Sequence, residues 1–228
     1  PDLDDAFMFY AMAEHKIDLR GYRFEHRLED IQTLNERALR GELDISAISS
    51  HAYAFVSDKY ALLSCGASMG DGYGPMLVTL ADAEAPAPDE LRNWLRGKRI
   101  AVPGKMTSAY LALQLYLGDF ESVVVASDQI FDAVKAGRAD LGLIIHEGQL
   151  TYAAAGFRKI LDLGAWWKEE TGLPLPLGGN VLRKGLAPEV QRDLAKILRE
   201  SIDDGLSHRE AAVRHSLPYA RDLDAALA

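Results

Sequence analysis

The sequence predicts an α/β protein with two lobes, each lobe containing a mostly parallel sheet flanked by helices. Short apolar segments of strand character alternate with amphipathic segments of helical spacing along most of the 228 residues. That alternation is typical of parallel sheets covered by helices on both faces. A helix-loop-strand pattern also occurs twice, around Gly41 and around Gly137. The repeat favours two halves of one design whose strand ends face a common cleft, although the same connection is also common in unrelated α/β proteins.

Composition narrows the range of partners. A formal charge of −9 argues against nucleic acid or an anionic membrane surface, because both are bound mainly through clustered Lys and Arg. No apolar run approaches the roughly 20 residues of a membrane span. The single cysteine, Cys65, excludes an intrachain disulfide, and none of the six histidines lies in an HExxH or HxH pattern. We therefore expect no metal and no cofactor, and the sequence does not indicate an oligomeric state.

The first half begins with acidic residues and good helix formers, which predict a helix over 5–15. Period-two alternation predicts a half-buried strand over 22–28. Apolar residues at helical spacing predict a helix over 31–39 that Gly41 stops, and 44–49 is the next strand.

A strand, a loop and another strand are expected next, at 60–65, 66–74 and 75–80. The loop is rich in glycine, but a strand follows it. The helix N-terminus that would hold the pyrophosphate of a dinucleotide is therefore absent from the pattern. We reject nucleotide binding at this loop.

The second half follows a linker-like stretch of alternating Ala and Pro at 85–88. Its expected strands are 98–103, 123–125, 141–145, 158–163 and 180–183, and its expected helices are 107–117 and 128–136. Two terminal helices come last, one beginning near Pro188 and one after the capping box formed by Ser207 and Glu210.

The residues that suggest chemistry stand at expected strand and helix ends. His146 and Glu147 follow an apolar strand, at the position where α/β proteins place ligands, and a neutral imidazole is the usual base near neutral pH. A single histidine in such a position is also often structural. Thr107 and Ser108 join a strand to a helix start, where N–H groups and the helix dipole favour a carboxylate, although such residues often serve only as caps.

Ser49 and Ser50 end the strand that corresponds to the His146 strand in the repeat. A nucleophilic role for Ser50 with His146 is conceivable, but there is no Gly-x-Ser-x-Gly elbow, so we interpret the serines as hydrogen-bonding residues for a ligand. Trp166 and Trp167 precede a Pro/Gly-rich segment and suggest either a rigid wall or an aromatic pair in the core.

Five segments together resemble one family, the 1,4-dihydroxy-6-naphthoate synthases of the futalosine route to menaquinone. In order along the chain these segments are 5–10, 49–53, 102–110, 142–147 and 162–178. The histidine and glutamate at the strand end and the Trp-Trp to Pro-Leu-Gly segment are the specific parts, because the related chorismate dehydratases usually have an Asp-containing turn in place of His146 and Glu147.

The resemblance implies a fold like that of the type II periplasmic binding proteins, with the ligand cleft between two lobes. It implies a discontinuous first lobe over 1–80 and 183–228 and a second lobe over 81–182. The hinge strands would lie near 76–80 and 180–183.

The resemblance also implies a lyase that cleaves cyclic dehypoxanthine futalosine to 1,4-dihydroxy-6-naphthoate without metal or organic cofactor. His146 would be the general base, Thr107 and Ser108 would hold a substrate carboxylate, and Ser49 and Ser50 would contact its polar groups, with Glu147 beside the base. This chain departs from the Cys-Pro-Asn-Asp-Thr-like opening of the family. The departure places Asp4 near the expected cleft, where it requires a hydroxyl-rich part of the ligand or a cation.

The alternative hypothesis is a non-catalytic solute-binding protein that captures a small carboxylate in the same cleft, since one fold hosts both activities. We expect a cytoplasmic enzyme. The chain opens without methionine, both of its ends resemble trimmed ends, and a secretory signal before residue 1 would indicate a periplasmic or extracellular binder instead.

Overall fold

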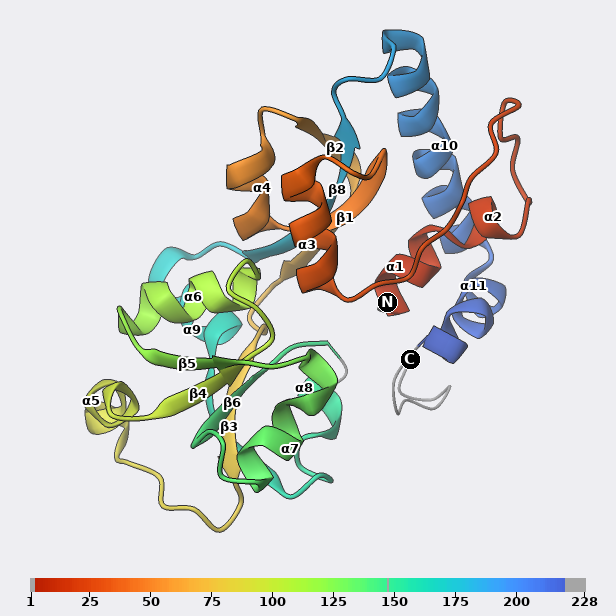
Figure 1. The fold of residues 1–228 in the computed structure, drawn as a ribbon. Coiled ribbons are helices and arrows are strands. Elements are labelled where there is room, and N and C mark those ends of the chain that lie inside the picture. Colours follow the sequence, from red (N-terminus) through yellow and green to blue (C-terminus); the bar gives the residue numbers. More distant parts are fainter. Residues whose placement is uncertain (1–2, 147, 220–228) are drawn as a thin grey trace. The chain divides into compact units, whose positions relative to one another are not determined.

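The computed structural model describes residues 3–146 and 148–219, and the chain forms two compact units (Figure 1). Unit 1 comprises Pro1–Ser68 and Gly178–Ala228, and unit 2 comprises Met69–Leu177. The chain passes between the units twice, within strands β2 (Tyr60–Gly70) and β8 (Leu175–Arg183).

Unit 1 is built on strands β1, β8 and β2, in that order. Its remaining elements are α1 (Leu3–Met8), α2 (Tyr10–Ala13), α3 (Ile31–Arg40), β1 (Ile45–Ser49), α4 (Ser50–Val56), α10 (Pro188–Ser207), α11 (Arg209–Ser216) and the 3-10 helix η3 (Leu217–Tyr219). β1 pairs antiparallel with β8, and this differs from the mostly parallel sheet expected for this lobe, because β8 belongs to the chain segment that returns from unit 2.

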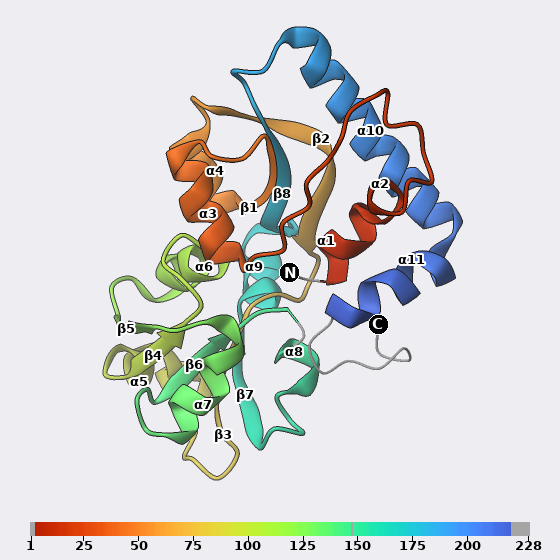
Figure 2. The same cartoon turned by 45° about the vertical axis from the view of Figure 1, so that its right-hand side comes forward.

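Helices cover both faces of the unit 1 sheet (Figure 2). On one face α3 and α4 bury Ala38 and Val56 against Ile48 and Val181. The apolar residues on the other face come from α2, α10 and β2. They include Met12, Ile197, Leu198, Leu63 and Cys65.

Helix α3 shows how local sequence defines an element. The Asp30 carboxylate accepts the backbone N–H groups of Gln32 and Thr33, both at 3.1 Å, and thereby caps the helix. Burial raises the pKa of Asp30, but the hydrogen bonds from Thr33 and Gln32 more than offset that effect and hold it below its usual value. Gly41 ends the helix at φ 72°, which is the left-handed conformation that glycine adopts readily.

Unit 2 contains a five-stranded sheet of order β5-β4-β6-β3-β7 in the described part of the chain. Its strands are β3 (Met76–Leu80), β4 (Arg99–Val102), β5 (Glu121–Val124), β6 (Leu141–Ile144) and β7 (Phe157–Asp162). Its helices are η1 (Pro88–Glu90), α5 (Leu91–Arg96), α6 (Ser108–Leu117), η2 (Ser127–Gln129), α7 (Ile130–Lys135), α8 (Gly148–Thr151) and α9 (Leu163–Thr171).

Successive residues of the unit 2 strands alternate between two cores. Leu77 and Leu143 belong to the core shared with α5, α6 and α9, while Val78 and Ile144 belong to the core shared with α7. Strands buried on both faces read as continuous apolar runs, which is why these segments were recognisable in the sequence. Trp166 and Trp167 lie in α9 and pack against the first core, as an aromatic pair in a helix.

The two units divide the chain at other residues than the lobe boundaries that the resemblance implies. β3 was counted with the first lobe, yet it pairs with β6 and β7 and therefore belongs to unit 2. The linker-like stretch at 85–88 lies inside unit 2 and leads into η1 and α5. The first passage between the units therefore lies within β2 and not near 76–80, whereas the second lies within β8, which contains 180–183. That these strands act as hinges stays a prediction.

Two sequence-based expectations fail in unit 1. The segment 22–28 is not a strand, because no neighbouring strand pairs with it among the described residues. The capping box also does not form, because the Ser207 hydroxyl donates to the Asp203 carbonyl instead and His208 precedes α11. The expected helix over 5–15 is present but interrupted at Phe9, between α1 and α2.

We predict that Gly164→Ala destabilises unit 2. A Cβ at this position would lie 1.9 Å from the Tyr73 carbonyl oxygen, and that backbone atom cannot move aside cheaply. The clash should lower the free energy of unfolding by about 2 kcal/mol, even though alanine favours helices. Urea denaturation measures the change. Gly97→Ala is the control, because nothing lies within 4 Å of its Cβ and its φ is −90°. Equal midpoints for the two variants would contradict the prediction.

Candidate functional site

The carboxyl ends of neighbouring strands bring two candidate segments together in unit 2. β4 and β6 are parallel, with Ile100 opposite Leu141 and Ala101 opposite Gly142. Parallel neighbours end at the same edge of a sheet. The loop that leads to α6 therefore leaves the same edge as the residues that follow β6. Ligands of α/β proteins bind at this kind of edge.

His146 lies two residues beyond β6, and its backbone has a φ of 52°. This left-handed conformation is uncommon for a residue with a side chain, and such strain gathers at functional sites. The His146 carbonyl accepts the N–H of Gln149 at 3.1 Å, so the turn leads directly into α8. The fold thus places a histidine with a strained backbone at the carboxyl edge of the sheet.

Thr107 caps α6 and is 2% exposed. Its hydroxyl accepts the N–H of Tyr110 at 3.2 Å and donates to the Gly104 carbonyl at 2.8 Å. The Ser108 hydroxyl donates to the Leu177 carbonyl. Both hydroxyl protons are therefore engaged within the protein. The attraction for an anion at this place comes from the positive end of the α6 dipole.

Ser49 is positioned in unit 1 by hydrogen bonds to the buried side-chain amide of Asn35. The Asn35 side chain accepts the Ser49 N–H at 2.9 Å, and its amide group donates to the Ser49 hydroxyl at 3.1 Å. Asn35 is fully buried and Ser49 is 3% exposed. Ser50 is half-buried and begins α4, so the predicted strand end turns at once into a helix that the sequence analysis did not predict.

Two predicted site residues are not described in full. Glu147 lies outside the described residues, and Asp4 belongs to α1 while its side chain lies outside the described part. Their proposed roles therefore stay predictions. Ser49 and Ser50 belong to unit 1, whereas Thr107, Ser108 and His146 belong to unit 2.

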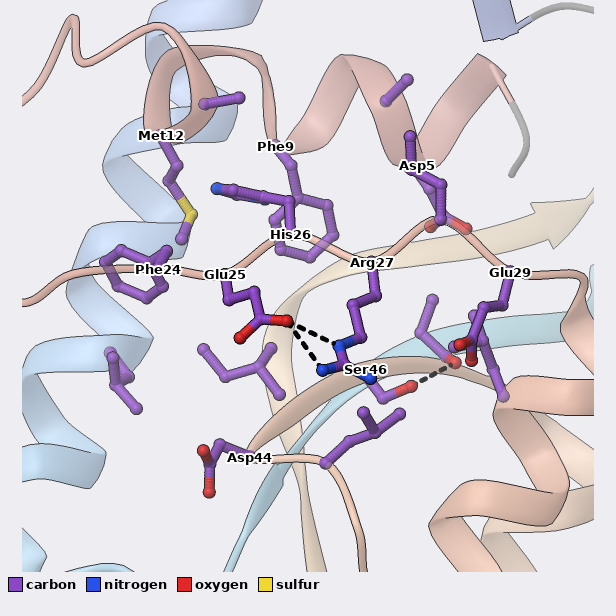
Figure 3. A pocket seen from close by; sticks show the side chains of 18 of the residues that line it. Asp5, Phe9, Met12, Phe24, Glu25, His26, Arg27, Glu29, Asp44 and Ser46 are labelled. Carbon is purple, nitrogen blue, oxygen red and sulfur yellow. Dashed lines mark hydrogen bonds and ion pairs between the residues drawn. The ribbon is translucent and has the colours of Figure 1, made fainter.

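A pocket of about 560 Å³ lies within unit 1 (Figure 3). It is lined by α1, α2, the segment 22–29, β1 and α10, by the middle of α3, and by His215 of α11 and Tyr219 of η3. Burial lowers the pKa of His26 in its wall, and His15 and His215 lower it further. Arg27 in the same wall forms an ion pair with Glu25 at 2.7 Å.

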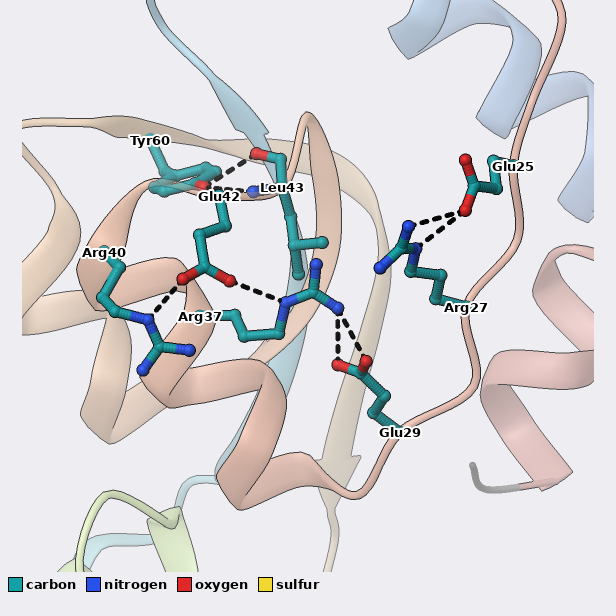
Figure 4. Close-up of polar contacts among 8 residues, drawn as sticks. All are labelled: Glu25, Arg27, Glu29, Arg37, Arg40, Glu42, Leu43 and Tyr60. Atoms are coloured by element: carbon teal, nitrogen blue, oxygen red, sulfur yellow. Dashed lines mark hydrogen bonds and ion pairs between the residues drawn. The ribbon is translucent and has the colours of Figure 1, made fainter.

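Arg37 connects the wall of this pocket to α3 (Figure 4). Its guanidinium donates to Glu29 at 2.7 Å and to Glu42 at 2.9 Å. Hydrogen bonds from Arg40 and, to a smaller extent, from Arg37 lower the pKa of Glu42. The end of the segment 22–29 is therefore anchored to the helix beneath it.

Asn35 and Arg37 were not predicted from the sequence. Asn35 had a detectable signal, because it stands between Ile31 and Ala38 on the apolar stripe of a predicted helix, and a polar residue on a buried face needs a partner. Arg37 had no such signal, since its partners Glu29 and Glu42 come from flanking loops.

No group of three or more His, Cys, Asp or Glu residues able to hold a metal ion is found within 3–146 and 148–219. Over the same residues, no helix is long and apolar enough to cross a membrane.

Solved structures share the fold of this chain. Protein AF1704 from Archaeoglobus fulgidus is 47% identical with a TM-score of 0.89, and the match covers 98% of this chain and 81% of that one. An alkanesulfonate-binding protein from Xanthomonas axonopodis pv. citri is only 15% identical but has a TM-score of 0.70, over 96% of this chain and 76% of its own. The chain therefore has the two-lobed α/β fold of periplasmic binding proteins.

Two curated relatives are named 1,4-dihydroxy-6-naphtoate synthase. The one from Thermus thermophilus is 40% identical over 98% of this chain and 78% of its own length. The one from Streptomyces coelicolor is 34% identical over 100% of this chain and 79% of its own length. A family model described as menaquinone biosynthesis matches residues 1–228. The chain belongs to this menaquinone biosynthesis family.

Proposed function

We propose that the protein is a carbon–carbon lyase that cleaves cyclic dehypoxanthine futalosine and releases 1,4-dihydroxy-6-naphthoate for menaquinone biosynthesis. The family and the names of the two curated relatives support this reaction. Within the structure, the observation that carries it is the strained histidine at the carboxyl edge of the unit 2 sheet.

His146 is the general base in this proposal. A neutral imidazole accepts a proton near neutral pH, and a base must be held in one orientation to act on one substrate atom. The left-handed turn at His146 gives its backbone one uncommon conformation and leads into α8, because the His146 carbonyl accepts the N–H of Gln149. The turn therefore serves to position the base.

The α6 N-terminus is the proposed site of the substrate carboxylate. The Thr107 and Ser108 hydroxyls donate to backbone carbonyls, so in this proposal they act by holding the helix end in place. The helix dipole favours an anion at this end by a few tenths to about 1 kcal/mol. A protein with a net charge of −9 needs such a local attraction for an anionic ligand.

Ser49 and Ser50 are the proposed contacts for the polar groups of the substrate, with Asp4 on its hydroxyl-rich part and Glu147 beside the base. Asn35 positions Ser49 through two hydrogen bonds. The ligand is thus a small carboxylated molecule. We propose that the reaction needs no metal or organic cofactor and takes place in the cytoplasm.

We predict that His146→Asn lowers kcat about 10²- to 10⁴-fold, which is the usual contribution of a general base. Asparagine tolerates the left-handed backbone, so the variant removes the base and leaves the turn intact. Release of 1,4-dihydroxy-6-naphthoate from cyclic dehypoxanthine futalosine measures the rate, and thermal unfolding measures the fold. His208→Ala is the matched control, because His208 lies at the exposed junction of α10 and α11.

A wild-type rate equal to that of His146→Asn would show that His146 is not the base. A wild type that binds a small carboxylate without turnover would contradict the lyase and support the solute-binding alternative.

We predict that Asn35→Leu raises KM more than it changes kcat. The substitution leaves the buried Ser49 N–H without its partner, which costs about 1–3 kcal/mol of stability and loosens a proposed substrate contact. Steady-state kinetics and urea denaturation give both values. Glu36→Ala on the exposed face of the same helix is the control. A loss of stability with unchanged KM would show that Asn35 supports only the fold.

We predict that Ser50→Ala raises KM severalfold and changes kcat less than twofold. The lost hydrogen bond should weaken binding of the substrate and of the transition state equally. Ser57→Ala, at the exposed far end of α4, should leave both parameters unchanged. Equal kinetics for the two variants would remove Ser50 from the site.

A further inference from the structure

Two helices of unit 2 approach the carboxyl edge of its sheet from opposite faces. α6, which begins after Thr107, packs in the core that contains Leu143. α7 packs on β6 and β4 from the other face, in the core that contains Ile144 (Figure 1). Because both helices follow strands that end at this edge, the residues after β6 lie between the start of α6 and the start of α7.

The connection from β5 to α7 places a carboxylate at this edge. β5 is parallel to β4, with Val102 opposite Val124. The pairing continues one residue further, since the Val125 N–H donates to the Val102 carbonyl at 3.1 Å. The chain then forms η2 and continues directly into α7. Asp128 in η2 therefore stands at the carboxyl edge, on the face of the sheet that α7 covers.

A glycine lets the start of α7 pack closely on β6. A Cβ at Gly142 would lie 2.5 Å from Cγ2 of Ile130, the first residue of α7. α7 runs from the carboxyl edge toward the amino ends of the strands, so Asp128 is nearer to that edge than Ile130 is. Gly142 and Ile144 contact the α7 face, and His146 is the next position in this alternation. Asp128 and His146 are thus placed at the same edge and on the same face.

Other charged groups at this edge already have partners or belong to the other face. The Asp162 carboxylate accepts two backbone N–H groups of α9, at 3.0 and 3.1 Å, and thereby caps that helix. Asp71, in the connection before β3, pairs with Lys168 at 2.8 Å. Lys105 is exposed in the loop that leads to α6. These contacts leave Asp128 as the described carboxylate best placed to meet the imidazole.

Asp128 does not serve as a helix cap. The residues that precede η2 and α7 make no side-chain cap hydrogen bond, and Asp128 lies inside η2. Its side chain is exposed, whereas His146 is half-buried. Both residues have interaction partners in the structure. A role for the Asp128 carboxylate therefore has to come from a neighbouring group and not from the backbone of its own helix.

We propose that Asp128 is a positioning residue for His146, whose imidazole donates one ring N–H to the Asp128 carboxylate and keeps its other nitrogen free for the substrate proton. This inference rests on the proposed role of His146 as the general base. The carboxylate fixes the tautomer of the ring and stays ionised while His146 gains the proton. It also stabilises the protonated imidazole and so raises its pKa. Asp128 thereby orients the base and makes it stronger.

The imidazole pKa of His146 tests the pair without any turnover. NMR titration of residues 1–228 gives this value, with the His146 signal assigned as the one that His146→Asn lacks. Asp128→Asn should lower the pKa of His146 by about 1 unit, because a neutral amide does not stabilise the imidazolium by charge. Asp128→Glu keeps the charge and should retain most of the wild-type pKa.

Asp132→Asn is the matched control for this titration. Asp132 is also an exposed carboxylate, and it lies in the first turn of α7, further from the carboxyl edge than Asp128. Its removal should change the pKa of His146 by less than about 0.3 unit, because solvent and salt screen a distant exposed charge. The two asparagine variants should have similar midpoints of thermal unfolding, since each removes one acidic group near the start of the same helix.

Steady-state kinetics provide a second measurement that a purely structural role would not change. Asp128→Asn should lower kcat about 10-fold or more, which is part of the 10²- to 10⁴-fold contribution of a general base, and should change KM less than about twofold. The base acts while His146 is neutral, and a lower pKa keeps it neutral at lower pH. The rising limb of kcat/KM against pH should therefore move to lower pH in Asp128→Asn.

An unchanged pKa of His146 in Asp128→Asn overturns the proposal, whatever happens to the rate. Equal shifts in Asp128→Asn and Asp132→Asn also overturn it, because they would reflect the net charge and not a contact. A shift in Glu147→Gln alone would assign the partner to Glu147. A wild type without turnover contradicts the proposed function instead, and the titration then still decides whether Asp128 and His146 form a pair. Asp128→Ser replaces Asp128→Asn in every comparison if the latter does not fold.

Discussion

The parallel pairing of β4 with β6 is the constraint on which the candidate site in unit 2 depends. It directs both carboxyl ends to one edge of the sheet, where the start of α6 supplies the positive end of a helix dipole and the residues after β6 supply a histidine. β7 leaves the same edge, because β7 and β6 are both antiparallel to β3. The candidate groups therefore come together at this edge because of the directions of the strands.

Unit 1 is organised by α3 in a comparable way. Asn35 on this helix is buried and hydrogen-bonds to Ser49. Arg37 on the same helix forms ion pairs with Glu29 and Glu42. The helix thereby positions both the end of β1 and the far wall of the pocket beside it. The left-handed turn at Gly41 ends α3, and a short connection then leads into that strand.

The agreement between sequence and structure is best where the local signal is complete. The helices ending at Gly41 and near Gly137 have left-handed glycines at 72° and 69° as their stop signals, and the strands after them were predicted from their apolar residues. The segment 22–28 has a strand pattern, but a strand also requires a neighbour. Ser207 and Glu210 have the spacing of a capping box, but the Ser207 hydroxyl donates to the Asp203 carbonyl instead.

The sequence by itself determined the α/β class, most strands and helices, the candidate residues at their ends, and the family through their resemblance. Periodicity and caps are local, so one chain segment is enough to specify them. Only the tertiary structure decided that β3 belongs to unit 2, that His146 occupies a left-handed turn, and that Asn35 holds Ser49. These depend on which distant segments become neighbours, and that is a property of packing.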